Sequence, residues 1–586
     1  MKTTILLVIF LLIGCSTTQT TQISHRGPDG PHKNNIYKDH ARPADLPTIN
    51  ISEANVPTFW TATATIIDTR EFDNQHQLAG EVAGTHHRPA KFLPVHRKPH
   101  FDEQGPPNTL RSGLGQSQTI IQDEIHFDAI VQTGWNPPDP SLAVGPDHVV
   151  VTVNMAIAFF DKEGNEQFSA NLDSTGNPGF FEEVGGGSFC FDPKCFYDAH
   201  AERFVVLALE YYDSGEGESF ITMAVSDDSD PNGVWYKYRM WSVITNDTNG
   251  NTYWVDYPGF GFDDGYYYVT GNLFGLNNGG WGGVLYRILD KTPMLTGDPV
   301  VVADVQKPGH ASMQCAQHIG DSPAAFFVGR RNNTELRVSY IDTPENPSVV
   351  SEFVAVPNHS TPSGVSNPGG TISALDGRIM NAQYRDGSLW TAHGIRGNDV
   401  SAVGRWYEID LSNWPAVGPT LVQSGDATVD GKSTFFPAIA QNKRGEVAII
   451  VASANDTSVP TLHLVGRKQG DPPGVMGLPT LVATSETGAD GRWGDYFDMT
   501  IDPNNDTRFW YVGEYQANSG WHTVVGSATI TCIEDINADG SVNITDLLAL
   551  ISVWGTAGDG AEIAAPYDVA DISDILAVIG ALGYCP

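Results

Sequence analysis

The chain has 586 residues and a mass of 63.3 kDa, too large for one ordinary compact core, so domains or repeated units are expected. Its 33 Lys and Arg residues against 69 Asp and Glu residues give a net charge of −36, which excludes nucleic acid as an expected partner and disfavours anionic lipid surfaces. A charged content of only 17%, with 61 Gly and 37 Pro, favours many short strands joined by turns.

Residues 1–15 have the features of an export signal. Lys2 precedes an apolar run that is too short to span a bilayer as a helix. The ending Leu12-Ile13-Gly14-Cys15 resembles the bacterial lipobox, which implies that Cys15 is lipidated and becomes the new N-terminus. A plain signal peptide with an incidental cysteine is the alternative. We therefore expect an exported protein, either held at the outer membrane or cell surface only through its lipid, or extracellular.

Residues 16–117 show no sustained hydrophobic periodicity and are rich in Pro, Thr, Asn and His. Such a segment buries too little apolar surface to fold by itself, so we expect a low-complexity tether. The histidines within it have no ligand-like spacing, which favours a polar stalk over a metal-binding tract.

From residue 118 to residue 530 one unit recurs about every sixty residues. Each unit has a tight polar turn, such as Gly145-Pro146-Asp147, followed by a strand too apolar to face water. Four strands per unit, repeated seven times, predict an all-β protein with a β-propeller. Seven blades are preferred, six or eight remain possible, and we expect a monomer. The last unit has only three strands, so strand 119–131 is expected to complete it and close the ring.

The tail, residues 531–586, contains the pattern of a calcium-binding loop. Oxygen-bearing side chains stand at loop positions 1, 3, 5, 9 and 12, and Gly540 stands at position 6, where such a loop turns sharply. The expected ligands are Asp535, Asn537, Asp539, the backbone carbonyl of Ser541, Asn543 and Asp546. Hard Ca²⁺ needs six to eight such oxygens, so Ca²⁺ is the expected cofactor, and a helix should follow directly.

The same helix recurs 28 residues later, since segments 543–555 and 571–583 are identical at six of thirteen positions. This duplicated loop and helix resembles a type I dockerin module, a family that binds calcium and docks onto cohesin domains in polysaccharide-degrading complexes. The resemblance implies a small α-helical module, a cohesin-like partner and a link to polysaccharide catabolism. The second loop has Ile563, Ala565 and Tyr567 at its first ligand positions, which argues against a second calcium ion.

The cysteines have a simple distribution. Cys532 and Cys585 bracket the tail module and are the candidates for a disulfide in an exported protein. The sequence does not indicate how Cys190, Cys195 and Cys315 pair.

In a propeller, the start of each innermost strand and the end of each second strand lie at the same end of the ring, so their side chains converge around the axis. The candidates in or near such positions are Asp139, Asp256, Asp495, Glu514, Glu210, Arg330, His393 and Arg492. Carboxylates and arginines gathered there can bind a polar ligand or act as acid and base at a sugar. The alternative is that aspartates at these repeated positions cap turns and tie neighbouring blades together.

The repeat array also resembles the sialidase-type propellers of secreted bacterial proteins. The turn 226–235 is similar to their aspartate box, although it is expanded and present once. The last unit, with Arg492-Trp493-Gly494-Asp495-Tyr496, resembles a group of uncharacterised secreted propellers. Sialidases bind the substrate carboxylate with three arginines; Arg330, Arg405 and Arg492 are available for such a triad, but no motif assigns them.

Three functions remain open from the sequence. The first is a carbohydrate-associated surface propeller that recognises a glycan, and the second is a glycoside hydrolase of sialidase-like type. The third is a non-catalytic scaffold for protein interactions. The chain contains no nucleophile elbow, zinc-protease helix or phosphate loop, so no motif identifies a reaction.

Overall fold

A computed structural model describes residues 49–51, 56–72, 119–174, 179–212, 217–246, 250–276, 280–531, 534, 536, 541–555 and 571–583. Several residues singled out above lie outside this part of the chain: Cys15, Cys532, Asp535, Asn537, Asp539 and Cys585. Within the described ranges, no helix is long and apolar enough to cross a membrane.

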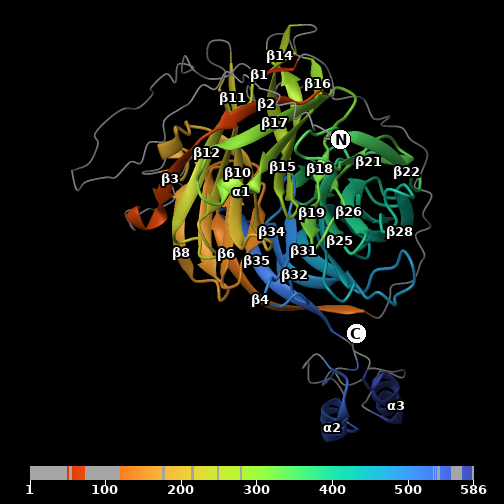
Figure 1. Cartoon of the computed structure of the whole chain (residues 1–586). Coiled ribbons are helices and arrows are strands. Elements are labelled where there is room, and N and C mark those ends of the chain that lie inside the picture. The colour runs from red at the N-terminus through yellow and green to blue at the C-terminus, as the bar shows by residue number, and fades with distance from the viewer. Residues whose placement is uncertain are drawn as a thin grey trace, which may run out of the picture.

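Seven groups of four antiparallel strands follow one another along the chain and surround a common axis (Figure 1). Blade 1 contains β5 (Ser141–Val144), β6 (His148–Val153), β7 (Ala156–Asp161) and β8 (Glu166–Asn171). Blade 2 contains β9 (Cys190–Asp198), β10 (Arg203–Tyr212), β11 (Glu218–Ser226) and β12 (Val234–Trp241). Blade 3 contains β14 (Asn251–Phe262), β15 (Tyr266–Gly275), β16 (Trp281–Asp290) and β17 (Val300–Lys307).

The remaining four blades follow the same order from the innermost strand outwards. Blade 4 contains β18 (Gln314–Cys315), β20 (Ala325–Arg330), β21 (Glu335–Ile341) and β22 (Val350–Ala355). Blade 5 contains β25 (Ile379–Arg385), β26 (Ser388–Ile395), β27 (Val403–Asp410) and β28 (Thr420–Ala427). Blade 6 contains β29 (Ser433–Gln441), β30 (Val447–Asn455), β31 (Ser458–Arg467) and β32 (Thr480–Thr484). Blade 7 contains β33 (Asp498–Ile501), β34 (Phe509–Ala517), β35 (Gly520–Thr531) and β4 (Ile120–Val131).

The expected closing strand is confirmed, because β4 precedes blade 1 in the sequence and pairs antiparallel with β35 of blade 7. In Figure 1 the orange β4 accordingly lies beside the blue β35. Ile121 and Ile130 of β4 are buried, whereas side chains between them alternate towards solvent, as expected for an outermost strand. The last blade thus gains its fourth strand from the start of the ring, and its edge is covered.

The innermost strands of blades 3, 4 and 5 contact one another directly at one end of the ring. The short strand β19 (Gln317–Ile319) pairs in parallel with both β14 and β25, which merges blades 3 and 5 into one twelve-stranded sheet. The number of hydrogen-bonded sheets therefore differs from the number of blades. Asn381 extends this closure by bonding the backbone of Ile439 in blade 6.

The segment predicted to be a tether contributes strands to the propeller. Strand β2 (Thr58–Ala62) pairs with the outer strand β17, and β3 (Ala64–Asp68) pairs with the outer strand β12. Strand β1 (Ile49–Ile51) pairs in parallel with β13 (Ile244–Asn246). Five-residue strands leave little periodicity, and their partners lie far away in sequence, so local pattern alone did not reveal them. Blades 2 and 3 therefore each carry a fifth strand.

Short helical elements occur at three loops. They are η1 (Thr69–Glu71), η2 (Glu182–Val184) and α1 (Lys291–Met294). A long connection between blades 4 and 5 contains the hairpin of β23 (Val365–Asn367) and β24 (Gly370–Ile372). This hairpin bonds the loop before blade 7, where Gly491 N donates to Thr371 O and Asn367 binds Ala489.

Two matching helices follow the propeller, α2 (Ile544–Ser552) and α3 (Ile572–Ala581). Each begins with the same capping box, in which Asn543 pairs with Asp546 and Asp571 pairs with Asp574. Leu550 and Val578 pack together in a small core with Val542. The duplicated helices predicted from the sequence are therefore present.

Candidate functional site

Five innermost segments share one backbone irregularity at the end of the ring where the second strands end. The left-handed residues there are Asp139 (φ 51°), Asp192 (φ 46°), Tyr257 (φ 53°), Ser312 (φ 45°) and Phe436 (φ 53°). In blades 3 and 6 this residue lies where the strand register shifts, so it belongs to a β-bulge. A left-handed conformation is costly for Tyr and Phe, and strain of this kind persists only where surrounding structure imposes it. Five blades therefore share a left-handed residue within or just before the innermost strand.

Asp139 ties three blades together. Its Oδ2 atom accepts a bond of 2.8 Å from Asn154 Nδ2, and its Oδ1 atom accepts one of 3.1 Å from the backbone N–H of Asp495 in blade 7. The side-chain oxygen of Asn154 in turn accepts a bond of 2.7 Å from the backbone N–H of Asp192 in blade 2. Asp139 therefore connects neighbouring blades, which is the alternative role that the sequence left open for aspartates at these positions.

Glu514 is the most unusual carboxyl group at this end. It is fully buried, and neither of its oxygens has a hydrogen-bond partner among the described residues. Burial, together with the neighbouring charges of Asp139 and Asp495, raises the pKa of Glu514 well above its ordinary value. Gly494 allows this close packing, because a Cβ atom at that position would lie 2.6 Å from Glu514 Oε2. Burial and two neighbouring carboxylates therefore both favour the protonated form of this side chain.

Arg492 supplies the positive charge of the group. It forms an ion pair with Asp495, three residues further along. Burial alone would lower its pKa, but Asp495 and Asp139 outweigh that effect and raise it. We call Asp139, Asp192, Arg492, Asp495 and Glu514 the axial cluster.

The side chains of the axial cluster and its neighbours differ in exposure. Arg492 and Asp376 are each 34% exposed, whereas the Asp495 side chain is 9% exposed. Asp376 binds Arg378 through two bonds of 2.8 and 2.9 Å, and the Arg378 guanidinium lies 4.2 Å above the Tyr257 ring. The exposed groups are therefore one guanidinium, Arg492, and one carboxylate, Asp376, whereas Asp495, Asp139 and Glu514 are buried.

A buried lysine lies at the base of this region. Lys194 Nζ lies 3.1 Å from the centre of the Tyr496 ring, and the Tyr496 hydroxyl donates to the carbonyl of Pro193. Burial lowers the pKa of Lys194 although Asp498, Asp139 and Asp192 oppose it, and burial likewise raises the pKa of Asp498 against Lys194. Asp498 also accepts a bond of 2.6 Å from Ser141 Oγ, so it connects blades 7 and 1.

Glu210 does not join the axial cluster, although it ends a second strand as Glu514 does. Its carboxylate binds Arg239 through bonds of 2.9 and 3.2 Å and also accepts bonds from Tyr212 and Thr222. Burial would raise its pKa, but Arg239 outweighs burial and lowers it. Glu210 therefore belongs to a closed ion pair inside blade 2.

The other sequence candidates have their principal contacts outside the axial cluster. Arg330 binds Asn333, Thr361 and the carbonyl of Asp376. His393 binds the carbonyl of Gly377 and the hydroxyl of Tyr407, and burial followed by the nearby His359 lowers its pKa. Asp256 is half-buried opposite Asn272 in the strand register.

The three arginines considered for a sialidase-type triad have separate partners. Arg405 is fully buried and pairs with Asp426, whereas Arg492 pairs with Asp495. Arg405 therefore does not offer its guanidinium group to a ligand at the surface.

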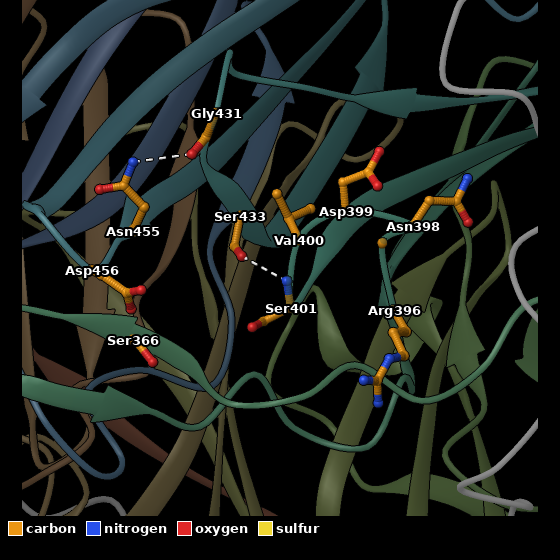
Figure 2. A pocket seen from close by; sticks show the side chains of 11 residues that line it. Ser366, Arg396, Asn398, Asp399, Val400, Ser401, Gly431, Ser433, Asn455 and Asp456 are labelled. Atoms are coloured by element: carbon orange, nitrogen blue, oxygen red, sulfur yellow. Dashed lines mark hydrogen bonds between the residues drawn. The ribbon is translucent and has the colours of Figure 1, made fainter.

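A separate pocket of about 420 Å³ lies between blades 5 and 6. Figure 2 shows Asp456 on one side of this opening and Arg396 with Asp399 on the other, around Ser401 and Ser433. These residues come from the loop between β26 and β27, the turn between β30 and β31, and the start of β29. Loops of this kind lie at the same end of the ring as the axial cluster.

Several residues of the axial region were missed by sequence reasoning. A sequence signal could have located Lys194 and Tyr257. In four blades the left-handed residue is followed by proline, as in Asp139-Pro140, Asp192-Pro193, Tyr257-Pro258 and Phe436-Pro437. Asp376 and Arg378 lie in the irregular connection between blades 4 and 5, which carries no repeat spacing. All three other cysteines, Cys190, Cys195 and Cys315, are buried free thiols.

Comparisons with known proteins give only distant likenesses. No family model and no curated protein matches the sequence. Among solved structures, the chain is similar to the α-L-arabinofuranosidase Arb93A from Fusarium graminearum, with 9% identity, a TM-score of 0.33 and coverage of 71% of this chain and 98% of that chain. It is also similar to Trypanosoma rangeli sialidase (11% identity, TM-score 0.32, coverage 70% and 61%) and to the WD40 domain of SCAP from fission yeast (10%, 0.29, 66% and 80%). Likeness at this level says nothing about what this chain binds.

Proposed function

We propose that this protein is a surface-held carbohydrate-binding propeller that takes up a glycan at the axial cluster. The observation that carries the proposal is a pair of partly exposed charged groups, Arg492 and Asp376, each held by a partner of opposite charge, Asp495 and Arg378. Sugar hydroxyls donate to carboxylates and accept from guanidinium groups, so a mixed layer of both suits an oxygen-rich ligand. Paired charges also fix the geometry of each group before a ligand arrives.

Glycoside hydrolysis is a second candidate, which Glu514 favours. Glycosidases pair a carboxyl group of raised pKa, which donates the proton, with an ionised carboxylate. The pKa of Glu514 is raised, and Asp495 forms an ion pair with Arg492. Binding takes precedence because Glu514 lies buried behind Gly494, and Asp139 already uses both oxygens to connect blades.

A glycan array and a screen of aryl glycosides with the full chain separate the two functions. Arg492→Ala is expected to abolish glycan binding, whereas Arg444→Ala, in the turn between β29 and β30 at the opposite end of the ring, should retain it. Release of the aryl alcohol that is lost in Glu514→Gln would establish hydrolysis instead. If the wild type shows no glycan binding and no turnover, the proposal is contradicted. Activity that survives loss of the axial carboxylates would exclude this site.

We further propose that the mature chain is anchored by lipid on Cys15. The lipobox resemblance supports this proposal, and the acidic net charge of −36 gives the protein no electrostatic attraction to anionic lipids. Metabolic labelling with a fatty acid is expected to label the wild type and not Cys15→Ala. Labelling that persists in the variant would contradict the anchor.

For the tail we propose a single Ca²⁺ ion in the first loop. Two of the expected ligands support this proposal by their position: Asn543 is the N-cap of α2, and Asp546 is a buried carboxylate in its first turn. Ser541, Asn543 and Asp546 would hold the ion together with Asp535, Asn537 and Asp539. The bound ion would neutralise these carboxylates and fix the loop before the helix.

A cohesin-like domain is the proposed partner of the tail module. Both helices present an exposed apolar row, Ile544, Leu548 and Ile551 on α2 and Ile572, Leu576 and Ile579 on α3. Small soluble modules rarely expose such rows unless they bind a partner. Binding to a panel of cohesin domains should be lost in Leu548→Asp with Leu576→Asp, and failure of the wild type to bind any of them would contradict this partner.

A further inference from the structure

The pocket between blades 5 and 6 is a second concave site, distinct from the axial cluster. Its volume of about 420 Å³ lies within the range of roughly 300–1,000 Å³ that is usual for small-molecule sites. It is lined by polar groups from three loops, with Val400 as the one branched apolar side chain among its lining residues.

Backbone bonds hold the walls of this pocket in place. Ser433 Oγ accepts bonds of 3.1 and 3.4 Å from the backbone N–H groups of Ser401 and Ala402. Asn455 Nδ2 donates to the carbonyl of Gly431 over 3.0 Å, and its oxygen accepts from Thr457 N. The pocket is therefore shaped before a ligand enters, which reduces the entropy cost of binding.

Three charged side chains at this pocket have no ion-pair partner among the residues that the structure describes. Arg396, Asp399 and Asp456 are exposed, and none of them forms an ion pair with any residue that the structure describes. Ion pairs elsewhere at this end of the ring are closed, as in Arg405 with Asp426. Unpaired donors and acceptors around a preformed cavity are the groups that a ligand can satisfy.

We propose that this pocket binds a neutral saccharide unit. A sugar ring offers hydroxyls that each donate and accept, and the pocket lining supplies two carboxylate acceptors, Asp399 and Asp456, and one guanidinium donor, Arg396. Two carboxylates against one guanidinium give the lining a net charge of −1, so an anionic sugar such as a uronate or sialic acid is disfavoured. The cavity volume suits one or two sugar rings.

This site stands independently of the proposed axial site, because the two share no residue. If the axial cluster fails to bind glycans, the pocket still predicts an affinity for neutral sugars. If the pocket fails, Arg492→Ala still tests the axial proposal. When both bind, an extended glycan is able to span the same end of the ring.

Isothermal titration of the full chain with cellobiose, maltose, lactose and glucuronic acid tests the proposal. At least one neutral disaccharide should bind, and Asp456→Asn or Arg396→Gln should weaken it by about tenfold or more, since each removes a charge-assisted hydrogen bond. Asp430→Asn, which removes the same charge from the neighbouring turn without lining the pocket, should leave the affinity unchanged.

Three results would overturn the proposal. They are the absence of binding by all three neutral sugars, tighter binding of glucuronic acid than of any neutral sugar, and affinities that do not change in either pocket variant. Thermal unfolding of each variant alongside wild type ensures that a lost affinity reports the pocket, because these exposed substitutions should leave stability unchanged.

Discussion

Replacing Glu514 by glutamine should change how the stability of the propeller depends on pH. Burial first, and then Asp139 and Asp495, raise the pKa of Glu514 well above its ordinary value of 4.5. In the unfolded chain this side chain loses its proton near that ordinary value, whereas the folded protein keeps it to higher pH. The folded state therefore binds more protons than the unfolded state in this window, and its stability falls as pH rises.

The size of this effect follows from proton linkage. For one group, the free energy of unfolding falls by about 1.4 kcal/mol for each pH unit over which only the folded state holds the proton. The contribution is fully favourable below the unfolded pKa and is lost as pH rises through the folded pKa. Glu514→Gln has a similar shape and no titrating proton, so this slope should disappear in the variant.

Urea unfolding followed by tryptophan fluorescence, at several pH values between 5 and 8, measures the difference in unfolding free energy between wild type and Glu514→Gln directly. The variant should gain stability relative to wild type with each unit of pH, beginning above the ordinary pKa of Glu. Glu163→Gln, an exposed glutamate in a turn of blade 1, is the matched control and should show no such trend. Parallel pH profiles for wild type and Glu514→Gln would refute a protonated Glu514.

Three further predictions concern stability and the metal. Glu210→Ala should cost about 3–5 kcal/mol in urea unfolding because it leaves Arg239 buried without its carboxylate, and adding Arg239→Met should recover much of the loss. Ile130→Ala in the closing strand should cost about 2–5 kcal/mol by the same assay, and a value near zero would argue against a ring closed by β4. In calorimetry, Asp535→Ala should remove a calcium-dependent rise in tail stability, whereas Asp574→Ala should keep that rise; calcium dependence in both variants would refute the first-loop assignment.

The sequence revealed the ring because its repeat is strict and its last unit is incomplete. A missing outer strand implied a closing strand, and β4 fills that place through pairing with β35. Strands β2 and β3 could not be recognised in the same way. Each is five residues long, and each is stabilised by a distant edge, as in the bond of 2.9 Å from Trp60 to Asp304.

The position of a residue within the repeat correctly predicted some members of the axial cluster and wrongly suggested others. Asp139, Asp495 and Glu514 do meet at the axis, since the ends of equivalent strands converge there. Glu210 holds the position of Glu514 in its own blade, yet Arg239 on the outer strand reaches it and closes the pair. Which partner a buried carboxylate finds depends on contacts across the blade, and these have no signature in local spacing.

The most direct test of the account is a crystal structure of the full chain with the glycan that binds best on the array. Sugar hydroxyls in contact with Arg492 and Asp376 are the predicted result. A glycan bound only on the outer blade edges or on the tail module, with the axial end empty, would contradict it.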